Sequence, residues 1–196
     1  MSDPKTISIY DAQATEYAEL TKADAIDKQL LAFIGDIPAG GHVLDLGCGP
    51  GHCAATMADH GLKVTASDAS LEMISLASRH PNVTTLHVTF DDISGVNLYD
   101  GIWANFSLLH APRADMPRYL ASLAQALKPG GRFHIGMKLG QGEQRDKIGR
   151  RYTYYSEDEL VRLVTNSALN VTNRTFGSGI GLDGSTSDWI SLTAHG

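Results

Sequence analysis

The sequence predicts an α/β fold, built on a mostly parallel β-sheet with helices on both faces. From about residue 42 onward, strand-like apolar runs alternate with segments of helical periodicity, which is the pattern of parallel strands joined by helical crossovers. The first apolar run leads directly into a glycine-rich turn, where ligands commonly bind in such sheets. The chain ends in two strand-like runs separated by a Gly/Ser-rich segment, so we expect an antiparallel hairpin at one edge.

The first half of the sheet is predicted from two apolar runs. Residues 42–47 (HVLDLG) and 63–68 (KVTASD) have strand character. The helix between them ends at Gly61, and a second helix begins after the N-cap residue Ser70. These elements form a strand–helix–strand–helix unit.

The second half continues the alternation. Residues 84–90 (TTLHVTF) and 99–107 (YDGIWANFS) are predicted as the third and fourth strands. Apolar side chains then recur at helical spacing, namely Met116, Tyr119, Leu120, Leu123 and Leu127. The sequence LKPGG ends this helix ahead of a fifth strand at 132–139.

The pattern changes after the fifth strand. Residues 140–151 are polar and contain glycine, and a helix then begins at the capping box that opens with Ser156 (SEDE). The expected hairpin has strands at 169–176 and 189–194. Ahead of the sheet, residues 11–35 look largely helical.

The composition is that of a globular protein without a membrane span. Hydrophobic residues make up 42% and charged residues 19%, and no apolar run approaches the ~20 residues that cross a bilayer. The N-terminal residues show no secretory signal, so we expect a cytoplasmic location. The net charge of −6 argues against a nucleic-acid partner, which would require clustered Lys and Arg.

Cysteine and histidine usage gives no sign of a metal site. Cys48 and Cys53 match neither a redox pair nor a zinc motif, and we expect both to be non-catalytic. The histidines also lack metal-ligand spacing. No metal cofactor is expected, and the sequence leaves the oligomeric state open.

The glycine turn is flanked by two carboxylates that suggest its ligand. Asp45 lies in the first strand just ahead of the turn, and Asp68 ends the second strand. A carboxylate at the end of the second strand can accept hydrogen bonds from both ribose hydroxyls. The helix after the turn offers unpaired N–H groups to an anion. The predicted ligand is therefore a riboside.

Two cofactor classes use this layout. A dinucleotide site requires G-x-G-x-x-G, whereas here the third glycine comes one residue early and Pro50 occupies the turn. An NAD site would also leave Asp45 unexplained. A ligand that carries an amino-acid group explains it, because an ammonium favours a nearby carboxylate. These demands fit S-adenosylmethionine.

These residues resemble the class I S-adenosylmethionine-dependent methyltransferases. VLDLGCGPG (43–51) is similar to the family's first motif, and DASLEM, which begins at Asp68, is similar to its acidic strand end. Similar segments follow in the family's order at 90–93 (FDDI), 99–110 (YDGIWANFSLLH) and 127–133 (LKPGGRF). The resemblance implies a Rossmann-like three-layer sandwich, with a seven-stranded, mostly parallel sheet and an antiparallel C-terminal strand.

The resemblance also implies an organisation of the chain. We expect one methyltransferase domain over residues 1–196. Residues 1–41 would form an N-terminal helical cap, and 42–139 would form the cofactor-binding core. Residues 140–196 would supply a lid segment, a helix and the hairpin.

For the methionine part of the cofactor, the resemblance implies contacts from the glycine turn. The backbone of Gly47, Cys48 and Gly49 would pass along the methionine part, with Gly51 completing the motif. Asp45 would face the ammonium directly or through water. A second interpretation stays open, in which Asp45 only caps amides of the turn.

For the adenosine part, the resemblance implies five contact residues. Asp68 would bind the ribose hydroxyls, with Ala69 and Met73 beside the adenosine. Phe90 and Asp91 would flank the adenine, Asp91 near its exocyclic amine. A second interpretation stays open for Asp68, in which it only accompanies Ser70 at the N-terminus of the helix that follows.

At the transfer end, Asn105 and Phe106 would lie close to the sulfonium, and Tyr17 would close over the cofactor. Phe106 has the alternative of a core position, as does the nearby Leu109. His110 follows the fourth strand and is the candidate catalytic residue, because an imidazole can take the proton from a hydroxyl nucleophile. A structural hydrogen bond to a neighbouring carbonyl is the alternative for His110.

The segment 138–155 combines basic residues with three tyrosines. One hypothesis makes it a lid whose side chains bind an anionic group of the substrate; the candidates are Arg150, Arg151, Tyr152 and Tyr155. The other makes it a solvated loop docked by a tyrosine.

The predicted activity is transfer of a methyl group to a small-molecule acceptor, with release of S-adenosylhomocysteine. The sequence ANFSLLH after the fourth strand departs from the N/D-P-P-Y pattern of many amino-group methyltransferases that act on DNA or protein. Two alternatives stay open. One is a methyltransferase for tRNA or a protein side chain, and the other is a non-catalytic module that binds S-adenosylmethionine.

Overall fold

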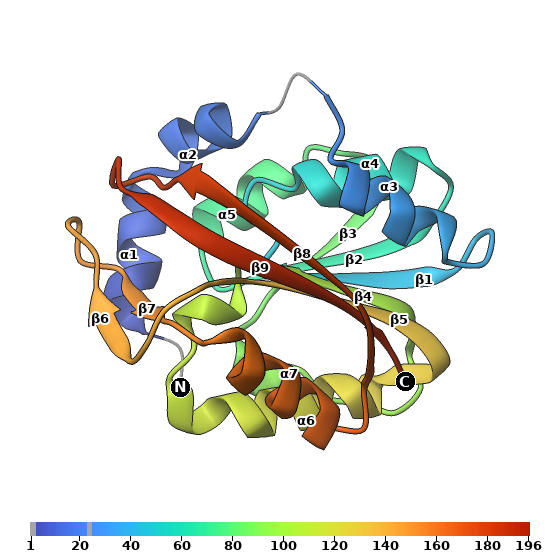
Figure 1. Ribbon diagram of the computed structural model, residues 1–196. Helices are drawn as coiled ribbons and strands as arrows, with labels where there is room; N and C mark the ends of the chain where they lie inside the picture. The colour runs from blue at the N-terminus through green and yellow to red at the C-terminus, as the bar shows by residue number, and fades with distance from the viewer. Residues whose placement is uncertain (1–2, 23–24) are drawn as a thin grey trace.

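The computed structural model describes residues 3–22 and 25–196. Its main sheet has seven strands in the order β3-β2-β1-β4-β5-β9-β8 (Figure 1). The strands are β1 (His42–Leu46), β2 (Lys63–Asp68), β3 (Val83–His87), β4 (Tyr99–Asn105), β5 (Leu127–Lys138), β8 (Asn170–Ile180) and β9 (Thr186–His195). β9 runs antiparallel to both neighbours, and the remaining pairs are parallel. This confirms the predicted mostly parallel sheet with an antiparallel C-terminal strand.

Helices cover both faces of the sheet and form the outer layers (Figure 1). The helices are α1 (Pro4–Ala12), α2 (Ala14–Thr21), α3 (Lys28–Gly35), α4 (His52–Asp59), α5 (Leu71–Ala77), α6 (Met116–Ala126) and α7 (Glu157–Asn166). α3 and α4 pack on one face and α6 and α7 on the other. None of the helices in the described ranges is both long and apolar enough to cross a membrane.

Side chains alternate along β1, so successive residues pack on opposite faces of the sheet. Val43 packs with α3 and α4, whereas Leu44 and Leu46 pack in the core under α6 and α7. Because successive strand residues point to opposite faces, Asp45 lies on the Val43 face. A carboxylate is thereby placed in a largely apolar layer beneath α4.

The segment predicted as a strand at 84–90 is only partly extended. β3 ends at His87, and Phe90 lies in a short 3₁₀ helix, Phe90–Asp92. The Thr89 hydroxyl accepts the amide of Asp91, while Asp92 accepts the amide of Thr89, so a capping box turns the chain here. The turn directs Phe90 toward the carboxyl end of β2.

The C-terminal hairpin is longer than predicted. Residues 177–188 were expected to form a loop, but β8 and β9 continue through most of them and the chain reverses between Gly181 and Ser185. The Trp189 ring lies over β8, where a Cβ on Gly177 would come within 2.2 Å of it. Glycine in this strand therefore makes room for the indole.

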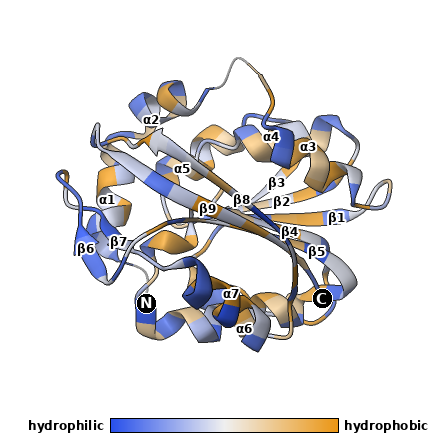
Figure 2. Ribbon diagram, viewed as in Figure 1, coloured by the Kyte–Doolittle hydropathy of each residue, from blue (hydrophilic) through white to orange (hydrophobic). Residues whose placement is uncertain are grey.

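The polar segment after β5 forms a small second sheet. β6 (Glu143–Arg145) pairs antiparallel with β7 (Arg151–Thr153), and this pair stands out as hydrophilic at the side of the molecule (Figure 2). The helix that follows begins as expected, because Ser156 and Glu159 form a reciprocal capping box. At the other end of the chain, the first helix starts at Pro4, earlier than predicted, because Asp3 caps it.

Candidate active site

Two adjoining pockets lie beyond the carboxyl ends of β1, β2 and β4. β1 is the point where the strand order reverses, since β2 and β3 lie on one side of it and β4 and β5 on the other. The smaller pocket has a volume of about 100 Å³ and the larger about 590 Å³. Both are lined by Tyr17, Gly47, Gly49, Asn105 and Phe106. One elongated ligand can therefore reach from one pocket into the other.

The glycines of the turn serve two different purposes. Gly47 and Gly49 line both pockets with φ of +69° and +53°, and a Cβ on Gly47 would lie 2.3 Å from that of Ser107. Gly51, with φ of +88°, lines neither pocket; a Cβ there would lie 2.8 Å from Ala77. The first two glycines shape the ligand surface, and the third lets α4 approach α5 closely.

Asp45 is a buried carboxylate with an unused oxygen. Its side chain lines the larger pocket and is 3% exposed. The backbone amide of Ala54 donates to it, but Oδ2 has no hydrogen-bond partner among the described residues. Burial, reinforced by the nearby Asp68, raises the pKa of Asp45 to about 7. A buried carboxylate oxygen without a donor is costly, and a ligand cation in this pocket would offset that cost.

Asp68 is oriented by backbone amides. Gly49 N donates to Oδ2 and Ser70 N donates to Oδ1, both at 2.9 Å. Burial raises the pKa of Asp68, and these amides oppose the rise. Each carboxylate oxygen can accept a further hydrogen bond, so both can still receive ligand hydroxyls. Asp68 and its expected neighbours Ala69 and Met73 line the smaller pocket.

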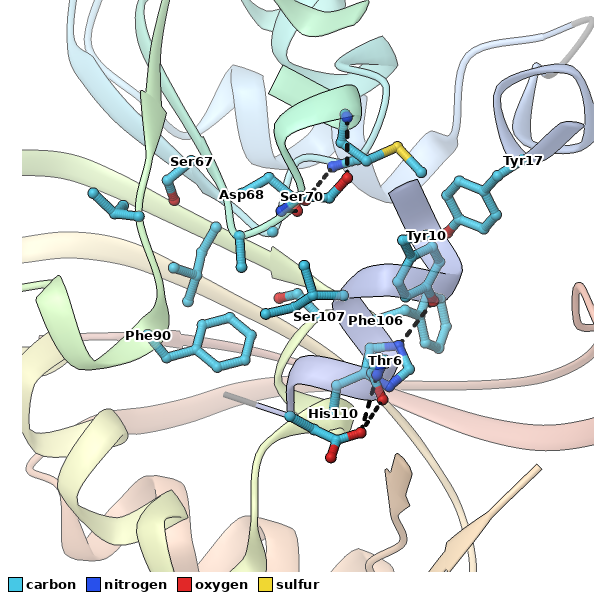
Figure 3. Close-up of a pocket in the computed structure, with 18 of the residues that line it drawn as sticks. Thr6, Tyr10, Tyr17, Ser67, Asp68, Ser70, Phe90, Phe106, Ser107 and His110 are labelled. Carbon is cyan, nitrogen blue, oxygen red and sulfur yellow. Dashed lines mark hydrogen bonds between the residues drawn. The ribbon is translucent and has the colours of Figure 1, made fainter. Parts of the chain in front are cut away.

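The two residues predicted beside the adenine separate in the structure. Phe90 lines the smaller pocket (Figure 3) and contacts the ring of Tyr119 edge-on at 5.7 Å between centroids. Asp91 lines neither pocket and is exposed. It accepts hydrogen bonds from Arg118 Nη2 at 2.6 Å and from the Tyr119 hydroxyl at 3.2 Å. The 3₁₀ helix presents successive side chains to different sides, which explains the separation.

Asn105 and Phe106 lie where β4 ends. Phe106 has φ of +54°, a conformation that costs free energy in a residue with a side chain. Its amide donates to the Gly136 carbonyl at 3.0 Å, and its ring contacts Trp189 edge-on at 5.8 Å between centroids. The strain is held by these contacts and turns the ring into both pockets. Leu109, by contrast, is a core residue, 2% exposed.

His110 lines the smaller pocket but does not point freely into it. Its Nδ1 lies 2.6 Å from the Arg151 carbonyl and its Nε2 lies 2.8 Å from the Tyr10 hydroxyl. Burial, followed by the charge of Arg150, lowers the pKa of His110 to about 4. The predicted alternative for His110, a hydrogen bond to a neighbouring carbonyl, is therefore present with Arg151 as the partner. A second hydrogen bond joins His110 to Tyr10, which also lines the pocket (Figure 3).

The four residues predicted to bind substrate line neither pocket. Arg150 is 1% exposed and pairs with Asp146. Tyr152 and Tyr155 are buried in the core, and Arg151 lies 3.6 Å from Glu143 at the surface. Because the segment pairs as β6 and β7 and packs on the core, the structure places these side chains behind or outside the pocket wall. It does not show them on a lid over the pocket.

The N-terminal helix α1 supplies site residues that the sequence did not indicate. Thr6 and Tyr10 line the smaller pocket, and the Thr6 hydroxyl accepts the Arg151 amide at 2.8 Å. Figure 3 shows Tyr10 between Tyr17 and His110; its ring lies 5.3 Å from that of Tyr17 and 5.4 Å from that of His110. The contact between Tyr10 and His110 could not be predicted from local sequence patterns, because the two residues are 100 positions apart.

Comparison with known proteins gives consistent relatives. A family model described as "Methyltransferase domain" matches residues 43–131. The chain is 31% identical over 139 residues to an S-adenosyl-L-methionine-dependent Diels-Alderase of Talaromyces variabilis, a match covering 65% of this chain and 47% of that protein. It is 31% identical over 105 residues to the ubiquinone biosynthesis O-methyltransferase of Xanthomonas axonopodis pv. citri, covering 50% and 43% respectively. The chain spans about half the length of these curated relatives.

A solved structure shares the whole fold. The 1,6-didemethyltoxoflavin-N1-methyltransferase of Burkholderia thailandensis, solved with 1,6-didemethyltoxoflavin and S-adenosylhomocysteine, superposes with a TM-score of 0.78 at 22% identity. The match covers 98% of this chain and 87% of that one. The family model and the related sequences identify residues 43–131, with their glycine turn, as a methyltransferase domain of the class I S-adenosylmethionine-dependent type, and the solved structure shares the fold of the chain.

Proposed function

We propose that the protein is an S-adenosylmethionine-dependent methyltransferase that acts on a small-molecule acceptor. The observation that carries this proposal is Asp45, whose buried Oδ2 lacks a hydrogen-bond donor among the described residues in a pocket beside the glycine turn. A riboside bearing an ammonium satisfies Asp45 and Asp68 together, whereas a dinucleotide would offer a ribose to Asp68 but no cation to Asp45. The sites of these two side chains thus favour the amino-acid-bearing cofactor.

The residues that line the two pockets fit the whole cofactor. Asp45 would hold its ammonium and the turn at Gly47 and Gly49 its methionine backbone, while Asp68 would receive the ribose hydroxyls. Met73 and Phe90 supply apolar surface for the adenine in the smaller pocket. When bound, the sulfonium supplies an electrophilic methyl group. The protein's own contribution is to position a nucleophile in line with it and to exclude water.

A small acceptor is supported by how the smaller pocket is enclosed. Helix α1 lies along it and is held to the body by polar contacts at both ends. Arg145 donates to both carboxylate oxygens of Asp3, at 2.8 and 2.9 Å, and Ser70 Oγ donates to Asp11 at 2.6 Å. An acceptor must fit beneath this helix. The Burkholderia neighbour was likewise solved with a small molecule, 1,6-didemethyltoxoflavin.

The relatives' names do not determine the atom that is methylated. They include an O-methyltransferase, an N-methyltransferase and a Diels-Alderase. The last of these is named for a reaction other than methyl transfer, so a chain that binds S-adenosylmethionine without methylating an acceptor is a second candidate, beside the non-catalytic module.

Calorimetric titration with S-adenosylmethionine, S-adenosylhomocysteine and NAD tests the cofactor assignment. We expect the two adenosyl ligands to bind and NAD not to bind. Asp68→Asn should weaken both adenosyl ligands at least ~10-fold, the scale of a lost charged hydrogen bond. Asp158→Asn, an exposed carboxylate of α7, is the matched control and should bind like wild type. Preferential binding of NAD would contradict the proposal.

Transfer of a labelled methyl group to a panel of small acceptors then tests the activity. Label recovered in a small product supports the proposal. Label recovered only in added tRNA or protein would favour a macromolecular substrate, and cofactor binding without any transfer would favour the non-methylating alternative.

A further inference from the structure

A chain of hydrogen bonds leads from the smaller pocket into the β6–β7 segment, and its proton positions follow from the partners. The Arg151 carbonyl can only accept, so His110 Nδ1, which lies 2.6 Å from it, must carry a proton. In a neutral imidazole the other nitrogen is then an acceptor. His110 Nε2 therefore receives the hydroxyl proton of Tyr10 across 2.8 Å.

The Tyr10 oxygen has one acceptor position left. Arg150 Nη1 donates to it at 2.8 Å, and a guanidinium can only donate. A phenol oxygen has two lone pairs, so one lone pair remains after Arg150 is counted. The Tyr152 hydroxyl also interacts with the Tyr10 side chain, so a ligand hydroxyl would take the place of that contact. Tyr10 lines the same pocket as Phe106 and Asn105, the two residues expected beside the sulfonium. The remaining lone pair can accept a proton from a ligand there.

The groups around His110 hold the hydrogen-bonded Tyr10 and His110 side chains in place and keep them uncharged. Arg150 is 1% exposed and is neutralised by Asp146, with Nε 2.8 Å from Oδ2. Its guanidinium also lies 5.2 Å from the ring centroids of both Tyr10 and Tyr152. From β5, Lys138 places its ammonium 4.1 Å from the centroid of the Tyr152 ring. Burial raises the pKa of Tyr10 well above its ordinary value and lowers that of His110, so both are uncharged near neutral pH.

We propose that Tyr10 binds the hydroxyl of an oxygen acceptor and relays its proton to His110, so that the protein is an O-methyltransferase. This inference rests on the proposed function. As the acceptor oxygen forms its bond to the methyl carbon, its O–H bond breaks and the proton moves to the Tyr10 oxygen. The original Tyr10 proton moves to His110 Nε2, and the electron pair of the broken carbon–sulfur bond stays on sulfur. His110 later releases its proton to water.

The charge balance favours this route. Before transfer the positive charge is on the sulfonium, and after transfer it is on the imidazolium, so no new charge is created in the buried site. An unprotonated amine such as an aniline needs no such path, because it attacks with its lone pair and can lose a proton to solvent afterwards. A hydroxyl of ordinary pKa must lose its proton as it attacks. A relay that ends on a buried neutral histidine therefore favours a hydroxyl acceptor over an amine that is already unprotonated.

The test compares methyl transfer to a panel of simple phenols and a matched panel of anilines, with S-adenosylmethionine binding measured on the same samples. Tyr10→Phe removes the relaying hydroxyl. His110→Asn removes the acceptor nitrogen but keeps an amide donor for the Arg151 carbonyl. Tyr99→Phe is the control for the first variant, since Tyr99 is buried and lines neither pocket. His60→Asn is the control for the second, since His60 Nδ1 also faces a backbone carbonyl, that of Thr56 at 2.8 Å.

We expect phenols to be methylated, with kcat reduced about 100-fold in both site variants and the acceptor KM changed less than about 3-fold. Both controls should match wild type. A nitro-substituted phenol that is already ionised at about pH 8 should restore most of the kcat of Tyr10→Phe, because its proton is already gone. A structural defect would not be rescued in this way.

Three results would overturn the relay. The first is that only anilines are methylated, and the second is that the cofactor binds but no phenol is methylated. The third is that Tyr10→Phe lowers kcat equally for ionised and un-ionised phenols. If wild type does not bind S-adenosylmethionine, the proposed function itself is contradicted, and the relay that depends on it is contradicted as well.

Discussion

Replacing Asp45 with asparagine should stabilise the protein in a way that depends on pH. In the unfolded chain Asp45 ionises near its ordinary pKa of 3.8, but in the folded protein it ionises near 7. Stability gained by keeping Asp45 neutral is therefore complete below about pH 4 and is lost progressively as the pH rises to about 7. Above about pH 7 the folded protein carries the full cost of a buried, under-satisfied carboxylate, and an uncharged amide at this position would remove that cost.

The magnitude follows from the shift in pKa. Between about pH 5 and pH 7 Asp45 keeps its proton in the folded protein but has lost it in the unfolded chain. Two pH units at about 1.4 kcal/mol per unit correspond to about 3 kcal/mol. The asparagine amide has its own burial cost of about 1–3 kcal/mol, but that cost is the same at every pH. Comparing two pH values therefore cancels it. For a chain of this size, about 3 kcal/mol corresponds to a change of roughly 6–12 °C in Tm.

The assay is thermal unfolding of wild type and Asp45→Asn at about pH 5 and about pH 8, without cofactor. The Tm of the variant minus the Tm of wild type should be roughly 6–12 °C higher at about pH 8 than at about pH 5. Asp158→Asn, whose carboxylate is exposed on α7, should show no comparable pH dependence. If the difference in Tm between Asp45→Asn and wild type is the same at both pH values, Asp45 titrates like an ordinary carboxylate and its burial does not raise its pKa.

Three further predictions follow from the same geometry. Gly51→Ala should lower the free energy of unfolding by about 2–3 kcal/mol in denaturant titration, because it adds a left-handed backbone penalty to a 2.8 Å contact with Ala77; an unchanged midpoint would contradict this packing role. Ser156→Ala should cost about 1 kcal/mol by the same measurement through loss of the capping box with Glu159, and Ser156→Asp should recover most of it. The affinity for S-adenosylmethionine, measured by calorimetry, should fall by up to about tenfold per pH unit below pH 7 as Asp45 becomes protonated, and a flat profile in that range would count against the ammonium contact.

The sheet and its glycine turn could be predicted because their signals are local. Alternation along 42–46 assigns each side chain to a face, and a glycine turn after a parallel strand has few possible roles. β2 and the capped start of α7 match the sequence prediction for the same reason. Each of these features depends on residues within a few positions of one another.

Other parts depend on contacts between distant segments. The length of the hairpin is explained by the Trp189 indole lying over Gly177, and glycines read in isolation indicate a loop. The position of Tyr10 against His110 depends on where α1 docks, which no local pattern records. Arg150 was expected at the substrate because basic residues on a polar segment are usually exposed. Its pairing with Asp146 allows it to be buried instead.

In the proposed function, the charge of Asp45 recognises the amino-acid end of the cofactor. The most direct measurement is calorimetric titration of wild type and Asp45→Asn with S-adenosylmethionine and with methylthioadenosine, which lacks the amino-acid group, at about pH 8. We predict that the variant binds S-adenosylmethionine about 10–100-fold more weakly, while its affinity for methylthioadenosine changes less than about 3-fold. Equal losses for both ligands, or no loss for S-adenosylmethionine, would contradict the account.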